Sequence, residues 1–180
     1  MKLDITKSGG FDAVARSDAR VLILGTLPGG NSLQRGEYYA QPRNAFWPIM
    51  NELVGASPSL SYADRTLRLV EKGIALWDVC LAGNRAGSLD SAIQLSSVVP
   101  NDFNAFLDIH TGIRLICFNG VTAAEIFRRK VLASLPAAAR LVRREVLPSS
   151  SPANTSMTLE QKLRCWRLVS LALTLSFFAC

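Results

Sequence analysis

The stretch Val21–Met50, VLILGTLPGGNSLQRGEYYAQPRNAFWPIM, decides the fold of this chain. It begins with four consecutive apolar residues, which favour a strand buried on both faces, as in a parallel sheet. Glycine and proline follow at positions 25 and 28–30, so regular structure ends there. Ligands of open α/β sheets bind beyond the carboxyl ends of the strands, which makes this turn a candidate site. Taken alone, such a turn is equally consistent with a tight connection.

The residues after the turn indicate which kind of ligand this site could bind. Their spacing matches neither the G-x-G-x-x-G dinucleotide motif nor the lysine-bearing phosphate loop, so nucleotide-cofactor classes lose their main support. Aromatic rings beside amide and guanidinium groups instead suit a nucleobase that is stacked and hydrogen-bonded. The residues concerned are Tyr38, Tyr39, Arg43, Asn44, Phe46 and Trp47.

The rest of the chain alternates strands with helices. We expect further strands over 73–80, 113–118 and 141–147, the last at an edge because two arginines interrupt it. The helical spacing predicts helices over 46–54, 62–72, 101–108 and 121–130. A last helix should begin near Thr158, which forms a capping box with Gln161. This alternation predicts a three-layer α/β/α sandwich with a mostly parallel four-stranded sheet, in a single domain over residues 1–180.

Composition and charge point to a polyanionic partner. The 180 residues are 49% hydrophobic, which is ample for a packed core. The 20 Lys and Arg residues exceed the 14 Asp and Glu residues, giving a net charge of +6 that favours nucleic acid. A basic but inert surface is the alternative. The first ten residues lack a signal-peptide pattern and no apolar run is long enough to cross a membrane, so we expect a cytoplasmic monomer without membrane association.

Cysteine and histidine give little sign of metal or redox chemistry. Cys80, Cys117, Cys165 and Cys180 form no C-x-x-C pair, so we expect reduced thiols, no iron–sulfur cluster and no other metal or cofactor. The single histidine, His110, lies before the strand over 113–118, on the side away from the expected site. A surface or capping role is therefore favoured over that of a general base.

Two segments resemble a known family. The segment over 25–50 resembles the first motif region of the uracil-DNA glycosylase superfamily, closest to its hypoxanthine-DNA (deoxyinosine) glycosylase branch and next to the mismatch-specific thymine/uracil glycosylases. The matching positions, in order, are Gly25, Pro28, Gly29, Ser32, Gly36, Tyr39, Pro42, Asn44, Phe46 and Trp47. LPSSSPAN over 147–154 is similar to the second motif of the superfamily, which lies after the last strand. The resemblance implies a uracil-DNA glycosylase-like fold.

The resemblance also implies a function and a set of roles. The chain should be a monofunctional glycosylase of base excision repair, acting on DNA with deaminated bases and releasing hypoxanthine from deoxyinosine sites. Asn44 would orient the attacking water and give electrostatic help. Tyr39 would stack on the flipped base. The other base-binding candidates are Gly25, Thr26, Leu27, Pro28 and Asp78, and the DNA-binding candidates are Arg43, Ser149, Ser150, Ser151 and Asn154.

Several of these residues also have structural interpretations. Asn44 could be a helix N-cap, and Asp78 could be a cap or the partner of an arginine. Arg43 could form a surface salt bridge. The three serines could simply form the turn before Pro152.

Three positions depart from the pattern of the superfamily. Leu27 replaces the Asp or Asn that positions or activates water, Ser149 replaces a histidine or asparagine, and Ala153 replaces the leucine that wedges into the duplex. No lysine lies in either motif, so a Schiff-base step is not expected. Two alternatives remain open: uracil as the main substrate, and a module that binds lesions without catalysis.

Overall fold

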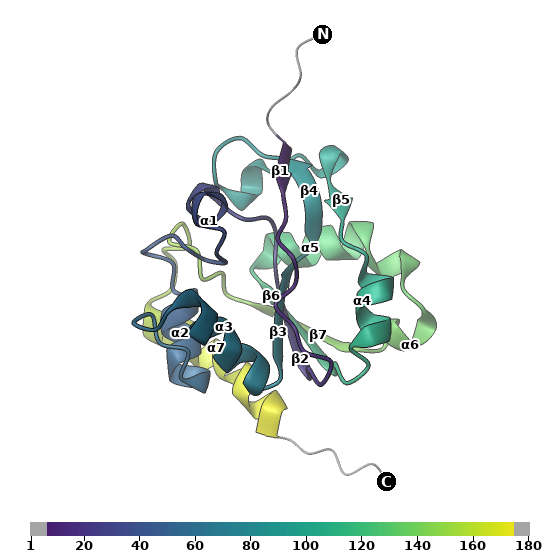
Figure 1. Cartoon of the computed structure of the whole chain (residues 1–180). Helices are drawn as coiled ribbons and strands as arrows, with labels where there is room; N and C mark the ends of the chain where they lie inside the picture. The colour runs from purple at the N-terminus through teal and green to yellow at the C-terminus, as the bar shows by residue number, and fades with distance from the viewer. Residues whose placement is uncertain (1–6, 175–180) are drawn as a thin grey trace.

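A computed structural model describes residues 7–174 and contains the expected parallel sheet at its centre (Figure 1). Its four strands are β2 (Val21–Gly25), β3 (Ile74–Asp78), β6 (Leu115–Asn119) and β7 (Arg143–Leu147). They run parallel in the order β3-β2-β6-β7. Every residue of β2 and β6 is buried, as expected for central strands covered on both faces. The predicted edge position of the last strand is confirmed.

Helices cover both faces of this sheet (Figure 1). One layer contains α2 (Phe46–Val54), α3 (Tyr62–Glu71) and α7 (Leu159–Thr174), and the other contains α4 (Phe103–Ile109), α5 (Val121–Lys130) and α6 (Ala137–Arg140). Side chains alternate along β2: Val21 and Ile23 pack into the first layer, and Leu22 and Leu24 into the second. The predicted three-layer α/β/α sandwich is therefore confirmed.

A second, smaller sheet was not predicted. It pairs β1 (Lys7–Gly9), β4 (Cys80–Asn84) and β5 (Val99–Pro100) in the antiparallel order β1-β4-β5. The prediction of one strand over 73–80 was wrong at its end, because β3 stops at Asp78 and β4 begins after a single residue. β4 has no regular alternation of apolar and polar residues, so its sequence gave no strand signal. Two short 3-10 turns, η1 (Asp90–Ala92) and η2 (Leu95–Ser97), lie between β4 and β5.

The ends of several helices agree with the sequence. α2 ends at Gly55, whose φ of 74° is left-handed. Before α7, the Thr158 N–H donates to Gln161 Oε1 over 2.8 Å, and the Gln161 N–H donates to Thr158 Oγ1 over 3.2 Å, so the capping box is confirmed. A short helix, α1 (Gly30–Arg35), and a 3-10 turn, η3 (Leu132–Ser134), were not expected.

His110 and two of the cysteines are buried, and a third cysteine is exposed. His110 is the C-cap of α4 and is buried, with Nδ1 2.8 Å from the Phe106 carbonyl oxygen, so the capping interpretation is confirmed and the surface one is wrong. Cys80 and Cys117 are buried free thiols and Cys165 is an exposed one. Cys180 lies outside the described residues. Within residues 7–174, no helix is long and apolar enough to cross a membrane.

Candidate active site

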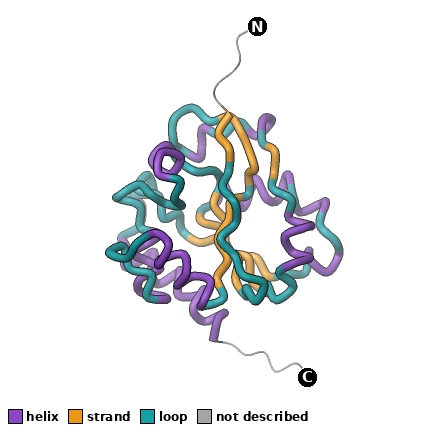
Figure 2. The backbone as a smooth tube through the Cα atoms, viewed as in Figure 1, coloured by secondary structure: helices purple, strands orange, loops and turns teal. Residues whose placement is uncertain are grey.

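A cleft of about 540 Å³ opens at the carboxyl ends of the main-sheet strands. Its walls are the turn after β2, the loop before α2, the loop after β4, the start of α5 and the loop over 149–154. The Ala45 N–H donates to the Ser150 carbonyl over 2.9 Å, so the two motif loops touch although about a hundred residues separate them. In Figure 1 the dark loop leading into α2 lies beside the yellow-green loop before α7, and Figure 2 shows both as loop on the left of the molecule.

Tyr39 is held as a platform beside this cleft. Its ring stacks on that of Phe46, with the centroids 4.0 Å apart and 21° between the planes. Tyr39 also lines the cleft, so a flat ligand bound there would lie beside this residue. Among the described non-glycine residues, only Tyr39 has a positive φ, at 54°. Such a backbone persists only where its surroundings fix it.

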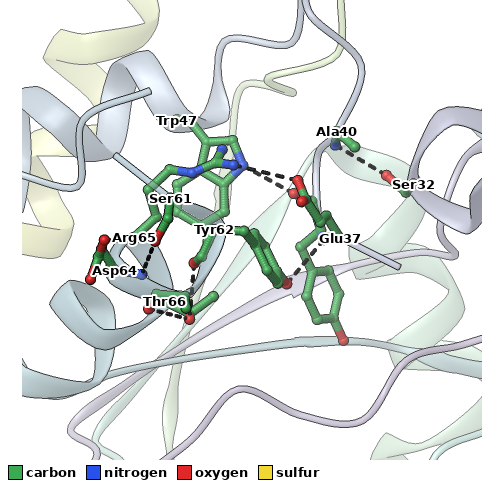
Figure 3. A network of polar contacts seen from close by, with 11 residues as sticks. Ser32, Glu37, Ala40, Trp47, Ser61, Tyr62, Asp64, Arg65 and Thr66 are labelled. Atoms are coloured by element: carbon green, nitrogen blue, oxygen red, sulfur yellow. Dashed lines mark hydrogen bonds and ion pairs between the residues drawn. The ribbon is translucent and has the colours of Figure 1, made fainter. Parts of the chain in front are cut away.

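Side chains from α2 and α3 fix the loop around that tyrosine (Figure 3). The Tyr38 N–H donates to the Tyr62 hydroxyl over 3.1 Å, and the Trp47 indole N–H donates to the Tyr38 carbonyl over 3.0 Å. The Arg65 guanidinium lies 4.6 Å from the Trp47 ring centroid and 3.4 Å from a carboxylate oxygen of Glu37. The backbone directly before Tyr39 is therefore held by side chains of two helices.

Asp78 forms the floor of the cleft at the end of β3. Its side chain is buried, and its Oδ2 has no hydrogen-bond partner among the described residues. It acts neither as a helix cap nor in an ion pair there. Burial, and next the neighbouring Asp90, raise the pKa of Asp78 to about 7, while Arg85 opposes the shift. A buried carboxyl group whose Oδ2 has no hydrogen-bond partner therefore lies at the floor of the cleft.

Gly25 allows this close arrangement. A Cβ at Gly25 would lie 2.5 Å from Asp78 Oδ1 and 3.0 Å from the Tyr39 hydroxyl oxygen. The side chains of both residues therefore reach the backbone of the turn, which a larger residue would prevent.

Arg85 and Asp90, which follow β4, complete the wall and were not predicted as site residues. The buried Arg85 guanidinium donates to the Leu27 carbonyl over 3.2 Å and to the Pro28 carbonyl, and lies 3.5 Å from Asp90 Oδ1. The same Asp90 oxygen accepts a 2.6 Å hydrogen bond from the Thr26 hydroxyl. The sequence showed only a polar loop here, because the partners of Arg85 lie nearly 60 residues away.

Asn44 lines the cleft and also begins α2. Its Oδ1 accepts the Phe46 N–H over 2.9 Å, whereas the N-cap position itself is Ala45. The predicted N-cap was therefore one residue early, although the side chain does satisfy a backbone N–H at the helix start. Asn44 Nδ2 makes no hydrogen bond to another described residue and is free to bind a ligand. Arg43 is exposed outside the cleft.

The serines of the second loop have different environments. Ser150 is completely buried and exchanges two 2.8 Å hydrogen bonds with Asn119: its Oγ accepts from Nδ2, and its N–H donates to Oδ1. Ser149 and Ser151 are half-buried and line the cleft. In this conformation Ser150 holds the loop to the end of β6, and the two outer serines are the ones that a phosphate could reach.

Helix α7 holds the remainder of that loop. Asn154, which also lines the cleft, donates from Nδ2 to the Ser149 carbonyl over 3.1 Å. The buried Lys162 ammonium donates to the Asn154 carbonyl over 2.9 Å, and the Trp166 indole donates to the Pro148 carbonyl over 2.9 Å. The loop is thus fixed by side chains that no motif pattern contained. Residues 7–174 contain no group of three His, Cys, Asp or Glu residues suited to a metal ion.

Comparison with known proteins identifies the family. The family described as the uracil DNA glycosylase superfamily matches residues 11–171. The chain belongs to this superfamily. The resemblance noted in the two motifs is therefore confirmed over nearly the whole chain.

Individual members of the superfamily are similar over most of their length. A hypoxanthine DNA glycosylase of Methanosarcina acetivorans is 37% identical over 146 residues, which cover 81% of this chain and 87% of the relative. A hypoxanthine DNA glycosylase of Methanosarcina barkeri is 35% identical over 120 residues, covering 66% and 75%. A solution NMR structure from Methanosarcina acetivorans, described as a candidate uracil DNA glycosylase, superimposes with a TM-score of 0.75 at 32% identity, covering 92% of this chain and 98% of that one.

The departures from the superfamily motifs have visible structural effects. The Leu27 side chain is buried in the apolar cluster beneath the turn, and its backbone carbonyl accepts a hydrogen bond from Arg85. Ala153 is exposed and small. The first motif therefore supplies no carboxylate of its own to the cleft.

Proposed function

We propose that this protein is a monofunctional DNA glycosylase of base excision repair that hydrolyses the N-glycosidic bond of a deaminated base flipped out of DNA. The single observation that carries the proposal is the Tyr39 ring, stacked on Phe46 and facing a cleft where both superfamily motifs meet. An extruded base needs such a platform because it loses its stacking partners in the duplex.

Each wall of the cleft has a task in this reaction. The flipped base stacks on Tyr39, and its polar edge meets Asp78 and the backbone of the turn over Gly25, Thr26, Leu27 and Pro28. Asn44 orients the attacking water through its free amide group, because a carboxamide cannot take up a proton. Bond cleavage proceeds through a positively charged sugar, with the negative charge passing to the departing base.

We propose hypoxanthine at deoxyinosine sites as the preferred substrate. Two relatives that match most of this chain are named hypoxanthine DNA glycosylases, which supports this choice. Hypoxanthine and uracil share a carbonyl next to a ring N–H, so a site that binds this edge is compatible with both. Uracil is the second candidate for that reason.

The rim of the cleft is where DNA would bind. We expect Ser149, Ser151 and Asn154, and Arg43 beside the cleft, to contact phosphates flanking the extruded nucleotide. Ser150 supports them by holding the loop. We further propose that the protein works as a monomer in the cytoplasm.

One assay tests the reaction. Purified protein is incubated with duplexes that contain a single inosine, uracil or xanthine, and abasic sites are revealed by alkaline cleavage. We expect cleavage at inosine first, and an Asn44→Ala variant that binds the duplex but releases base at least 100-fold more slowly. Preferential release of uracil would favour the second candidate. Binding of the duplexes without any abasic site, unaltered in Asn44→Ala, would support a lesion-binding module instead.

A further inference from the structure

The proposed reaction releases a proton from water, and Leu27 cannot accept it. Within the described part of the chain, the titratable residues that line the cleft are Tyr38, Tyr39, Asp78, Arg85 and Asp90. Burial raises the pKa of both tyrosines, so they stay protonated, and an arginine remains charged in proteins. Only the two carboxyl groups can serve as a base.

The two carboxyl groups differ in burial and in hydrogen bonding. The Asp78 side chain is buried at the cleft floor, with its Oδ2 unpartnered. The Asp90 side chain is 35% exposed and lines the same cleft. Both polar contacts of Asp90, from Thr26 and Arg85, fall on Oδ1, and Oδ2 makes no hydrogen bond to another described residue. Asp90 is therefore the carboxylate that a water molecule can reach.

The Thr26 contact also places Asp90 next to the position where the motif lacks its acid. Thr26 precedes Leu27 directly, and the 2.6 Å hydrogen bond ties the Asp90 carboxylate to that point of the turn. A loop that follows β4 thus brings a charge to the place where the superfamily pattern has an Asp or Asn inside the first motif.

We propose that Asp90 is the general base of this enzyme, an inference that rests on the proposed glycosylase function. As the N-glycosidic bond breaks, its electron pair leaves with the base. The oxygen of the water bonds to the sugar carbon C1′, and the proton that this water loses passes to Asp90 Oδ2. Asn44 orients the water, and Asp90 takes its proton.

The charges around Asp90 are suited to this task. Burial raises its pKa, while the Thr26 hydroxyl and the Arg85 guanidinium oppose the shift and favour the carboxylate. The other titratable groups facing it are Asp78 at the end of β3, Cys80 in β4 and Tyr39 in the loop before α2. Asp78 Oδ2 has no hydrogen-bond donor, whereas the Thr26 hydroxyl and the Arg85 guanidinium both contact the Asp90 carboxylate, so the charged form is favoured at Asp90.

The test is the single-turnover rate of hypoxanthine release by Asp90→Asn across the pH range. The amide keeps an oxygen acceptor for Thr26 and removes only the charge and the basicity. We expect a rate at least about 100-fold below wild type at neutral pH, with unchanged binding of a duplex carrying a non-cleavable inosine analogue. The wild-type rate should rise with pH as Asp90 loses its proton, and that rise should be missing in the variant. Asp108→Asn, which removes an exposed charge outside the cleft, should behave as wild type.

The outcomes separate this inference from the proposed function. If the wild type releases hypoxanthine and Asp90→Asn does so within threefold of it, or loses activity equally at every pH, Asp90 only holds the turn and the inference is overturned. A rise with pH that survives in Asp90→Asn but disappears in Asp78→Asn would assign the base to Asp78 and also overturn it. If the wild type releases no base at all, the proposed function itself fails.

Discussion

A Cβ added at Gly25 would lie 2.5 Å from Asp78 Oδ1, so the end of β2 and the floor of the cleft are in contact at the limit of close packing. Gly25→Ala should displace the carboxyl group, lower the free energy of unfolding by about 1–3 kcal/mol and reduce base release at least tenfold. Gly29→Ala is the matched control for stability, since a Cβ there would approach no atom more closely than 3.9 Å. Urea unfolding and single-turnover assays measure the two effects. Equal stability of the two variants would contradict the close contact.

Asp78 should make stability depend on pH. Its pKa in the folded protein, about 7, exceeds the ordinary 3.8, so the folded state holds a proton that the unfolded chain has released. Stability from this group is therefore complete below about pH 4 and is lost as pH rises toward 7. Asp78→Asn should be more stable than wild type at pH 8, by at most about 4 kcal/mol, and equal to it near pH 4. Parallel unfolding curves at pH 4, 6 and 8 check this sign.

The stacked pair of Tyr39 and Phe46 predicts a specific loss of activity. Phe46→Leu removes the surface that backs the tyrosine and should cost about 1–3 kcal/mol of stability, with a tenfold or larger fall in base release. Phe127→Leu, in the opposite layer, is the control because it removes a fully buried ring that does not line the cleft. It should lose similar stability and keep its activity below its unfolding transition. If both variants lose activity in proportion to stability, the platform has no special role.

Replacing Arg85 by lysine should lower both the stability and the activity of the protein. Its planar guanidinium bonds the Leu27 and Pro28 carbonyls and pairs with Asp90, which a single ammonium cannot reproduce. Arg85→Lys should be destabilised by about 2 kcal/mol or more and should release base slowly, because the glycine-rich turn loses its anchor. A melting temperature unchanged from wild type would show that the turn holds its shape without Arg85. Arg128→Lys on α5, paired at the surface with Glu125, should change neither property.

Arg43 should contribute to affinity through charge alone. It is exposed beside the cleft and forms no ion pair with another described residue. Arg43→Gln should weaken duplex binding similarly for all sequences and lower the slope of log affinity against log salt by about 1. Fluorescence anisotropy across salt concentrations measures this slope. An unaltered slope would exclude a phosphate contact by Arg43.

The sequence predicted the main sheet well because its signals are local. Four apolar residues at 21–24, a terminating glycine at 55 and the capping box at 158 each depend on residues within a few positions of one another. The small sheet was missed because β4 is short and irregular and pairs with β1, which lies far away in sequence, and with β5, which has only two residues.

Those site residues that lie within a continuous motif could be predicted, because a motif is also a local signal. Tyr39 and Asn44 stand inside a continuous motif, and the structure places both at the cleft. Arg85, Asp90 and Lys162 lie outside any motif, and their roles depend on partners that only the folded chain brings near. The burial of Ser150 could not be read from a run of three serines with identical chemistry.

Only Val79 separates β3 from β4, and its N–H donates to the Gly25 carbonyl while the Cys80 N–H donates to that of Thr26. These two hydrogen bonds join the start of the small sheet to the turn after β2, next to Asp78 at the floor of the cleft. The loop that carries Arg85 and Asp90 is therefore anchored to the main sheet beside Asp78, and these three side chains line one continuous part of the cleft.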